Sequence, residues 1–259
     1  FTVSVGGQPK YSKDYAPLPA GITHVPFNDV AALEATISDK TCAVIIEPIQ
    51  GESGILPATQ EYLQAARRLC DKHGALLILD EVQTGMGHTG KLFAYEHYGV
   101  TPDIISSAKA LGGGFPIGAI LTTDKIAPTF GPGTHGSTFG GNPMACAVGS
   151  HAFDIINAPE TLAHVKQQGQ KLQTALREIG EKTGVFKEVR GMGLLLGCVL
   201  ADKYEGKASE ITAAALKHGL MVLVAGANVV RFAPSLLLND EDMAEGLKRF
   251  EAALAEWLA

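Results

Sequence analysis

Residues 42–80 decide the fold class, and they read CAVIIEPIQGESGILPATQEYLQAARRLCDKHGALLILD. The apolar runs over 42–47 and 75–79 each have the length and composition of a buried strand. Between them, residues 59–73 place apolar side chains at helical spacing, and Gly74 is a typical helix stop. Strand, helix and strand in this order indicate a parallel sheet and predict an α/β fold.

The sequence on either side of this unit extends the pattern. Residues 1–30 are rich in Gly, Pro and Tyr and are expected to form loop with short extended pieces. Downstream, we expect strands at 104–105, 117–121, 220–224 and 229–233 and on both sides of 191–193, and helices over 143–182, over 208–218 and from Asn239 onward. We therefore predict a mostly parallel sheet flanked by helices over 1–150, followed by linker helices and a small α+β domain over 151–259.

Composition excludes several classes of protein. Of 259 residues, 46% are hydrophobic, and the net charge of −6 comes with no basic block, so neither nucleic acid nor an anionic membrane is an expected partner. No apolar run is long enough to span a bilayer. The cysteines are scattered without a Cys-x-x-Cys pair, which predicts free buried thiols, no metal site and a cytoplasmic location. These cysteines are Cys42, Cys70, Cys146 and Cys198.

A nucleotide-binding site is one reading of residues 80–91. The segment GMGHTGK at 85–91 satisfies most of a phosphate-binding loop, and Asp80 ends an apolar strand as a magnesium-binding acid does. However, Leu92 stands where a hydroxyl is needed, and no helix-forming run follows Lys91. The supposed loop also follows the acidic strand directly, whereas the two features normally lie on separate strands. We expect no nucleotide to bind here.

Asp80 and Lys109 are the residues with the clearest potential for chemistry. A carboxylate that ends an all-apolar strand is destabilising unless a cation or strong donors meet it. Lys109 follows a strand and lies among Ala, Leu and Gly, where desolvation would favour the neutral amine that attacks carbonyl groups. Judged locally, Asp80 can equally be a capping residue, and Lys109 a surface lysine before a flexible loop.

Four motifs resolve these alternatives by resemblance. They are EPIQGE at 47–52, LDEVQTG at 79–85, SAKALGGG at 107–114 and HGSTFGGNP at 135–143. In order and spacing they resemble the class III aminotransferases, which are fold-type-I enzymes dependent on pyridoxal 5'-phosphate (PLP). Residues 1–12 and 229–235 are most similar to the branch of this family that acts on acetylornithine.

The resemblance implies a role for each residue of the cofactor site. Lys109 would bond to the aldehyde of PLP and later carry a proton between substrate and cofactor. Asp80 would pair with the pyridine nitrogen, and Gln83 would hydrogen-bond the phenolic oxygen of the ring. Thr138 would reach the cofactor phosphate, and Ser137 the substrate, from a neighbouring subunit, so that a homodimer shares the active site.

The resemblance also implies the substrates. Arg231 would bind the α-carboxylate of glutamate, and Glu52 would pair with Arg231 while a basic substrate is bound. The implied reaction moves the ω-amino group of N-acetylornithine to 2-oxoglutarate in arginine biosynthesis. Succinylornithine, succinyl-diaminopimelate and ornithine are alternative donors. An aminomutase of the same fold, or a fragment that only folds and dimerises, are the rival functions.

Three departures from the family pattern bear on these implied roles. Ser53 stands where a glycine is usual, and His88 stands where arginine is usual, so a stiffer turn and a lost interface or loop contact are expected. The family also has a substantial segment before the residue that matches Phe1, with a phosphate-binding turn, an aromatic residue that stacks on the cofactor and a substrate-binding arginine. We therefore expect an N-terminally truncated chain with weakened cofactor binding and turnover.

Overall fold

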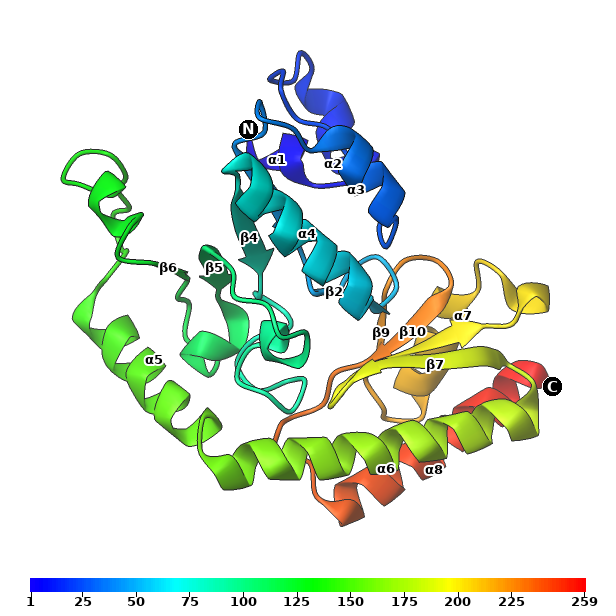
Figure 1. The fold of residues 1–259 in the computed structure, drawn as a ribbon. Coiled ribbons are helices and arrows are strands. Elements are labelled where there is room, and N and C mark those ends of the chain that lie inside the picture. The colour runs from blue at the N-terminus through cyan, green and yellow to red at the C-terminus, as the bar shows by residue number, and fades with distance from the viewer.

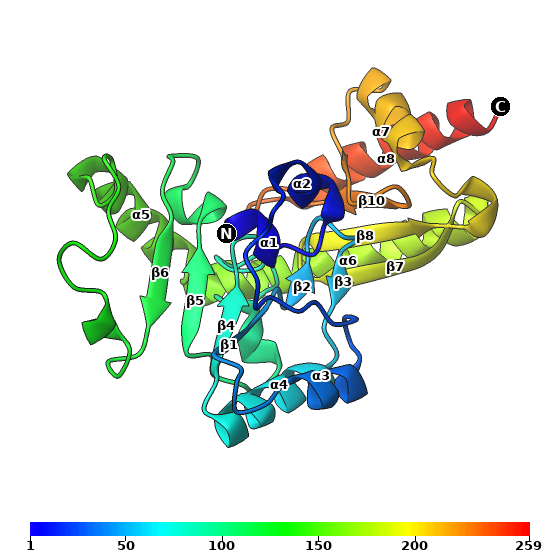
Figure 2. The same ribbon diagram turned by 90° about the horizontal axis from the view of Figure 1, so that it is seen from above.

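The structure, a computed structural model, describes residues 1–259 and contains two four-stranded sheets and one two-stranded sheet (Figures 1 and 2). The strands are β1 (Ala43–Ile46), β2 (Ile49–Gln50), β3 (Leu56–Pro57), β4 (Leu76–Asp80), β5 (Ile104–Ser107), β6 (Ala119–Thr122), β7 (Phe186–Met192), β8 (Leu195–Leu200), β9 (Leu223–Val224) and β10 (Val229–Phe232). The α-helices are α1 (Thr2–Val5), α2 (Pro9–Ser12), α3 (Val30–Thr36), α4 (Gln60–His73), α5 (Pro143–Ile156), α6 (Pro159–Thr183), α7 (Ala208–Lys217) and α8 (Asp240–Leu258). Short 3₁₀ helices cover Lys13–Tyr15, Ala94–His97, Lys109–Gly112, Ala127–Thr129 and Asp202–Tyr204. No helix is both long and apolar enough to cross a membrane.

The first sheet has the order β1-β4-β5-β6 and confirms the predicted α/β class. Strands β1, β4 and β5 are parallel, as the segment 42–80 predicts. The prediction that residues 117–121 continue the parallel pattern is wrong, because β6 runs antiparallel to β5. Only residues 108–118 connect the two strands, and this connection is too short to hold the helical crossover that parallel neighbours need.

Helix α4 forms where its apolar spacing predicts it. The hydroxyl of Thr59 accepts a hydrogen bond from the backbone of Tyr62 at the helix start, and Gly74 ends the helix in the left-handed conformation with φ of 69°. Such a cap contributes about 1 kcal/mol. The helix buries Leu63 and Cys70 in the core under the first sheet. Helices α3 and α4 lie on the same side of this sheet (Figure 2).

The second sheet has the order β7-β8-β10-β9, is antiparallel throughout, and has α6, α7 and α8 around it (Figure 1). Every residue of β8 is buried. Phe250 of α8 is fully buried and stacks on Phe186 of β7, so the helix seals the apolar core of this sheet. The two large sheets thus have separate cores.

Several local predictions need correction. The helix expected over 143–182 forms as two helices, α5 and α6. It is interrupted at residues 157–158 because Pro159 disfavours helical geometry in the residue before it. The first 30 residues contain the short helices α1 and α2 instead of extended pieces, and only Leu223–Val224 of the expected strand 220–224 forms. Cys42 and Cys146 are exposed, so the prediction of buried thiols holds only for Cys70 and Cys198.

The segment between β2 and β3 joins the two sheets. Ile55, which is completely buried, packs in a third apolar cluster with Leu195 and Val199 of β8 and Val229 of β10. Gly197 leaves the space for it, because a β-carbon at that position would lie 2.8 Å from the β-carbon of Ile55. The tip of the β2–β3 hairpin is therefore embedded in the core of the second sheet.

A second junction lies at the turn between β7 and β8. A β-carbon on Gly169 of α6 would lie 2.3 Å from the carbonyl oxygen of Gly193 in this turn. On the other side, Leu194 donates a backbone hydrogen bond of 2.9 Å to the carbonyl oxygen of His88. The turn is held between α6 and the segment that follows Asp80, and only glycine allows the helix to approach it so closely.

Candidate active site

Asp80 and Lys109 are brought together by two neighbouring parallel strands. Asp80 ends β4 and pairs in register with Ser106 of β5, and Lys109 follows three residues later. The carboxyl ends of parallel strands meet at one edge of a sheet, where α/β proteins bind ligands. Asp80 is half-buried, accepts a hydrogen bond of 3.0 Å from the backbone of Val82 and forms no ion pair. It therefore retains acceptor capacity for a cationic group.

The backbone at Lys109 is strained. Its φ is 49°, in the left-handed region that non-glycine residues rarely adopt and that costs on the order of 1 kcal/mol or more. Gly113 and Gly114 complete the turn with φ of 55° and 106°, which glycine adopts freely. Strain of this kind persists only where surrounding structure enforces it, and it concentrates at functional sites.

Lys109 lies at the surface of the chain, at the edge of a cavity of about 720 Å³. The cavity is also lined by His88, residues 113–117 and residues 234–237. Desolvation is the largest influence on the pKa of Lys109 and lowers it, and the charge of Arg231 acts in the same direction. The charges of Glu52 and Asp80 oppose this shift. The amine is thereby more available as a nucleophile than an ordinary lysine.

Glu52, Gln83 and Arg231 form one polar cluster. Nη1 of Arg231 donates to Oε1 of Glu52 at 2.7 Å and to Oε1 of Gln83 at 3.2 Å, and Nε2 of Gln83 donates to Oε1 of Glu52 at 3.0 Å. The hydrogen bond from Arg231 is the main reason that the pKa of Glu52 lies below its ordinary value. Nε of Arg231 is buried and has no partner, so it can donate to a further acceptor.

The structure keeps Ser137 and Thr138 apart from this cluster. Both are exposed on the loop before α5, where Oγ of Ser137 accepts only a local hydrogen bond from the backbone of Gly140. Of the predicted site residues only Lys109 lines the cavity, so Asp80 and the cluster of Glu52, Gln83 and Arg231 lie outside it as Ser137 and Thr138 do. Of the departures from the family pattern, Ser53 is exposed, and the ring of His88 contacts the carbonyl oxygen of Gly85 at 3.3 Å.

Two acidic residues near the site carry structural roles that the sequence did not assign. Oε2 of Glu47 accepts a hydrogen bond of 3.0 Å from the backbone of Gly51, and burial raises the pKa of Glu47. Glu81 is buried and accepts from the backbone of Ala94 and Tyr95, which fixes the segment after Asp80. Burial raises the pKa of Glu81 as well. Their place inside the motifs was the main signal in the sequence, since most of their partners are backbone atoms; Glu81 also accepts a hydrogen bond from the hydroxyl of Thr84.

Comparison with known proteins identifies the class. A family model described as aminotransferase class-III matches residues 1–254, and the chain belongs to this family. Acetylornithine aminotransferase of Neisseria meningitidis serogroup B is 81% identical over the whole chain. The succinylornithine transaminase/acetylornithine aminotransferase of Pseudomonas aeruginosa is 60% identical over 99% of the chain. The chain spans 65% of the length of the first relative and 63% of the second.

Solved structures give the same fold. N-acetylornithine aminotransferase from Stenotrophomonas maltophilia is 46% identical with a TM-score of 0.86, over 93% of this chain and 64% of that one. An ornithine aminotransferase from Toxoplasma gondii, described with PLP at partial occupancy in its active site, is 32% identical with a TM-score of 0.91, over 98% of this chain and 61% of that one. The predicted fold-type-I architecture is confirmed.

Proposed function

We propose that the protein is a PLP-dependent aminotransferase that moves the ω-amino group of N-acetylornithine, or a related acylated diamino acid, to 2-oxoglutarate in arginine biosynthesis. The observation that carries this proposal is the strained Lys109 at the end of β5, beside the half-buried carboxylate that ends β4. The similarity to acetylornithine aminotransferases supports the choice of substrate.

The residues present fit PLP. Asp80 has no basic partner in the chain, so a protonated pyridine nitrogen would satisfy it. Gln83 uses one N–H of its amide for Glu52, which leaves the second N–H for the phenolic oxygen of the ring. Lys109 would hold the cofactor covalently, and its amine would then move a proton at the substrate carbon that bears the amino group. When bound, PLP supplies the electron sink for that proton transfer.

Arg231 and Glu52 would recognise the two substrates in turn. With Glu52 paired to Arg231, the cluster is neutralised and can accept an amine donor. When Glu52 withdraws, Arg231 loses its charged partner, and its guanidinium can bind a carboxylate of 2-oxoglutarate or glutamate in two-point contact through the unpartnered Nε and the adjacent Nη2. One pocket thereby serves two substrates of different charge.

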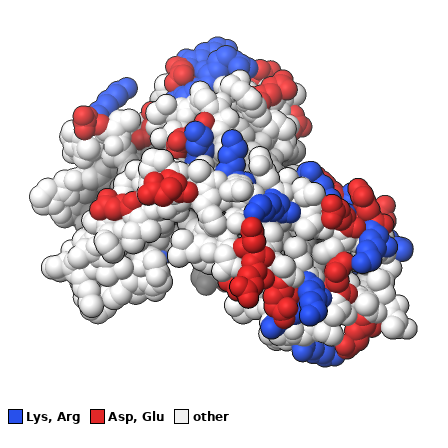
Figure 3. All heavy atoms as spheres, turned by 90° about the horizontal axis from the view of Figure 1, so that it is seen from below, with Lys and Arg blue, Asp and Glu red and all other residues white.

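We further propose a homodimer formed through the segment before α5 and α5 itself, with Ser137 and Thr138 directed to the partner's site. Residues 126–153 contain no Lys, Arg, Asp or Glu. Phe139 and Met144 within this stretch are 80% and 66% exposed. Large exposed apolar surface of this kind is typical of subunit interfaces. The part of the molecule that holds α5 carries few charges, whereas both signs mix over the part that holds α6 and α8 (Figure 3).

Two further features of the proposal concern organisation and location. We place the boundary of the large PLP-binding domain near residue 150, because the two large sheets and their cores lie on opposite sides of it in the sequence. A cytoplasmic location is supported by the four cysteines, which form no disulfide.

The proposal is tested by covalent labelling. The 259-residue chain is incubated with PLP, reduced with borohydride and digested, and mass spectrometry then locates the pyridoxyl group. We expect it on Lys109. The label should disappear in Lys109→Ala and persist in Lys91→Ala, a lysine in the glycine-rich segment 85–91. Labelling spread over surface lysines, unchanged by Lys109→Ala, would overturn the proposal.

A second assay separates the proposed reaction from an aminomutase. Glutamate formation from N-acetylornithine should depend on added 2-oxoglutarate, because a transaminase needs a separate amino acceptor. Conversion of the amine without 2-oxoglutarate would instead indicate an aminomutase.

A further inference from the structure

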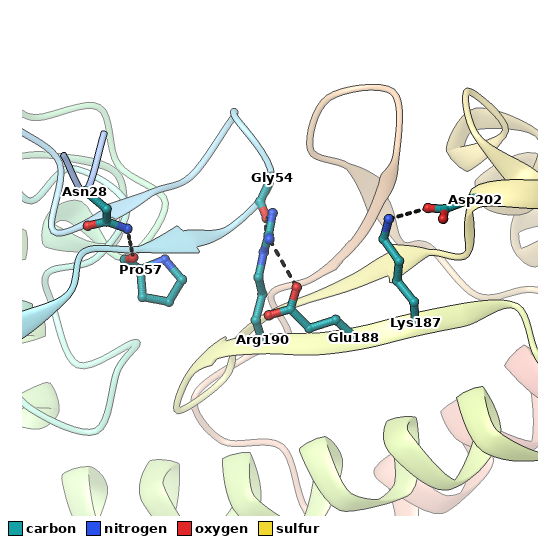
Figure 4. A network of polar contacts seen from close by, with 7 residues as sticks. All are labelled: Asn28, Gly54, Pro57, Lys187, Glu188, Arg190 and Asp202. Atoms are coloured by element: carbon teal, nitrogen blue, oxygen red, sulfur yellow. Dashed lines mark hydrogen bonds and ion pairs between the residues drawn. The ribbon is translucent and has the colours of Figure 1, made fainter. Parts of the chain in front are cut away.

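Arg190 of β7 holds the loop that carries Glu52 by hydrogen bonds to its backbone. Its Nε and Nη2 donate hydrogen bonds of 2.9 and 2.8 Å to one acceptor, the carbonyl oxygen of Gly54, which lies 136 residues away in the sequence (Figure 4). Nη1 of Arg190 bonds Oε2 of Glu188 at 3.2 Å on the same strand, which fixes the direction of the guanidinium. Two donors of Arg190 therefore hold the loop, and the third keeps the guanidinium in position on β7.

The loop is shaped to receive the guanidinium. Gly54 has φ of 102°, a conformation that strains any other residue, and a β-carbon there would lie 2.8 Å from Nη2 of Arg190. Gly54 is buried and the side chain of Arg190 is 21% exposed, so water competes weakly for these hydrogen bonds. Arginine supplies two parallel donors, whereas lysine would supply one point charge.

Glu52 lies between two anchored backbone positions. On one side, the carbonyl oxygen of Gly51 accepts a hydrogen bond of 3.1 Å from Nη1 of Arg231. On the other side, Gly54 is held by Arg190, and Ile55 beyond it is buried in the core of the second sheet. The backbone of the loop is thus fixed from both ends, while the side chain of Glu52, which pairs with Arg231, is 51% exposed.

We propose that Arg190 is a positioning residue that holds the loop 51–55 so that Glu52 meets Arg231, and that it thereby sets the balance between the amine donor and the dicarboxylate acceptor. The second half of this inference rests on the proposed function. Loss of the hydrogen bonds from Arg190 to Gly54 lets Glu52 leave Arg231 more often. Binding of the amine donor weakens, while the freed guanidinium binds a dicarboxylate at least as well as before.

Hydrogen–deuterium exchange tests whether Arg190 holds the loop, and it needs no activity measurement. Arg190→Met should speed exchange of a peptide spanning 50–55 by about tenfold or more, because the loop opens when its charged hydrogen bonds are lost. Arg190→Lys should give an intermediate rate. The matched control is Lys187→Met on the same strand, since Lys187 pairs with Asp202 away from the loop (Figure 4). Unchanged exchange in peptides of α4 shows that each variant is folded.

Equal exchange of the loop in wild type and Arg190→Met, or an equal increase in Lys187→Met, would overturn the positioning role. Should Arg190→Met fail to fold, Arg190→Lys carries the comparison, because it keeps the charge and loses only the fork of donors.

Substrate kinetics with PLP test the second half. Arg190→Met should raise the KM for N-acetylornithine about threefold or more and leave the KM for 2-oxoglutarate unchanged or lower, as Glu52→Gln should do. General structural damage would instead raise both values. If wild type shows no amino transfer at all, the proposed function fails and the substrate balance fails with it, while the exchange experiment still decides whether Arg190 holds the loop.

Discussion

Glu52 and Arg231 lie 179 residues apart in the sequence, yet Oε1 of the glutamate and Nη1 of the arginine are 2.7 Å apart. Glu52 sits in the loop between β2 and β3, and Arg231 sits in β10 of the second sheet. The pair therefore links the two halves of the chain, and the charges of both residues act on Lys109. A displacement of one half of the chain against the other would therefore separate this ion pair.

Neutralising Glu52 should strengthen the binding of a dicarboxylate. In Glu52→Gln, no ion pair has to be broken before Arg231 can bind a carboxylate. An ion pair with one exposed member contributes about 1 kcal/mol or less to stability. We therefore expect glutarate to bind about two- to fivefold more tightly in the presence of PLP, measured by titration calorimetry. Glu245→Gln, which removes the acid of an ion pair with Arg249 in α8, is the control and should leave glutarate binding unchanged. Equal affinities for wild type and Glu52→Gln would contradict the role of this pair.

His88 should make the stability of the chain depend on pH below neutrality. Burial lowers the pKa of His88 below its ordinary value of 6.5, so the unfolded chain takes up a proton that the folded chain resists. Stability should then fall as pH drops below 6.5 and stop falling below the pKa of the folded state. Urea unfolding of wild type at pH 7.5 and 5.5 should show a larger difference than unfolding of His88→Gln. His24→Gln, which changes an exposed histidine outside the proposed interface, is the control and should behave as wild type does.

Two helix-interior glycines should respond to alanine with opposite signs. Gly169→Ala of α6 places a β-carbon 2.3 Å from the carbonyl oxygen of Gly193, so the helix must move from the turn. We expect it to lose about 1–3 kcal/mol of unfolding free energy. Gly246→Ala of α8 meets only Leu220 at 3.7 Å and should gain up to about 1 kcal/mol from helix propensity. Chemical denaturation measures the unfolding free energy of both variants. A stabilised Gly169→Ala would contradict the close approach of α6 to the turn at Gly193.

The proposed dimer predicts an effect of charge on the uncharged stretch 126–153. Met144→Glu should shift the chain toward monomer in sedimentation velocity, because a charge buried in an apolar interface is strongly unfavourable. Met221→Glu changes a methionine outside this stretch that is even more exposed than Met144, and it should leave the sedimentation coefficient unchanged. A wild-type chain that stays monomeric at every concentration tested would remove the basis of the shared site.

The sequence predicts the first sheet well because its signals are local. An apolar run, a capped helix and a second apolar run define β1, α4 and β4, and the carboxylate of Asp80 marks the strand end. The direction of β6 was not predicted correctly, because periodicity gives the presence of a strand and not its orientation. The expected helix over 143–182 was found as two helices, although Pro159 was a visible local signal for the break.

The candidate site divides in the same way. Lys109, Asp80 and Gln83 lie in motifs that can be recognised in the sequence, whereas their proximity depends on the register of β4 against β5. Arg190 could not be predicted, because its partner is a backbone carbonyl far along the chain, and such a contact leaves no pattern of residue types. The strain at Lys109 could not be predicted either, because nothing in the sequence shows that this lysine adopts a positive φ.

The absent side chain at Gly197 ties the choice of residue there to the choice at position 55. The β-branched bulk of Ile55 occupies the volume that any larger residue at 197 would need. A library that randomises position 197 alone should return glycine almost exclusively among folded clones. A library that randomises positions 55, 197 and 229 together should admit alanine at 197 only when glycine stands at 55 and a smaller residue at 229, because the β-carbon of Ile55 and Cγ1 of Val229 lie nearest to the missing side chain. Redesign of this junction therefore has to treat the three positions as one unit.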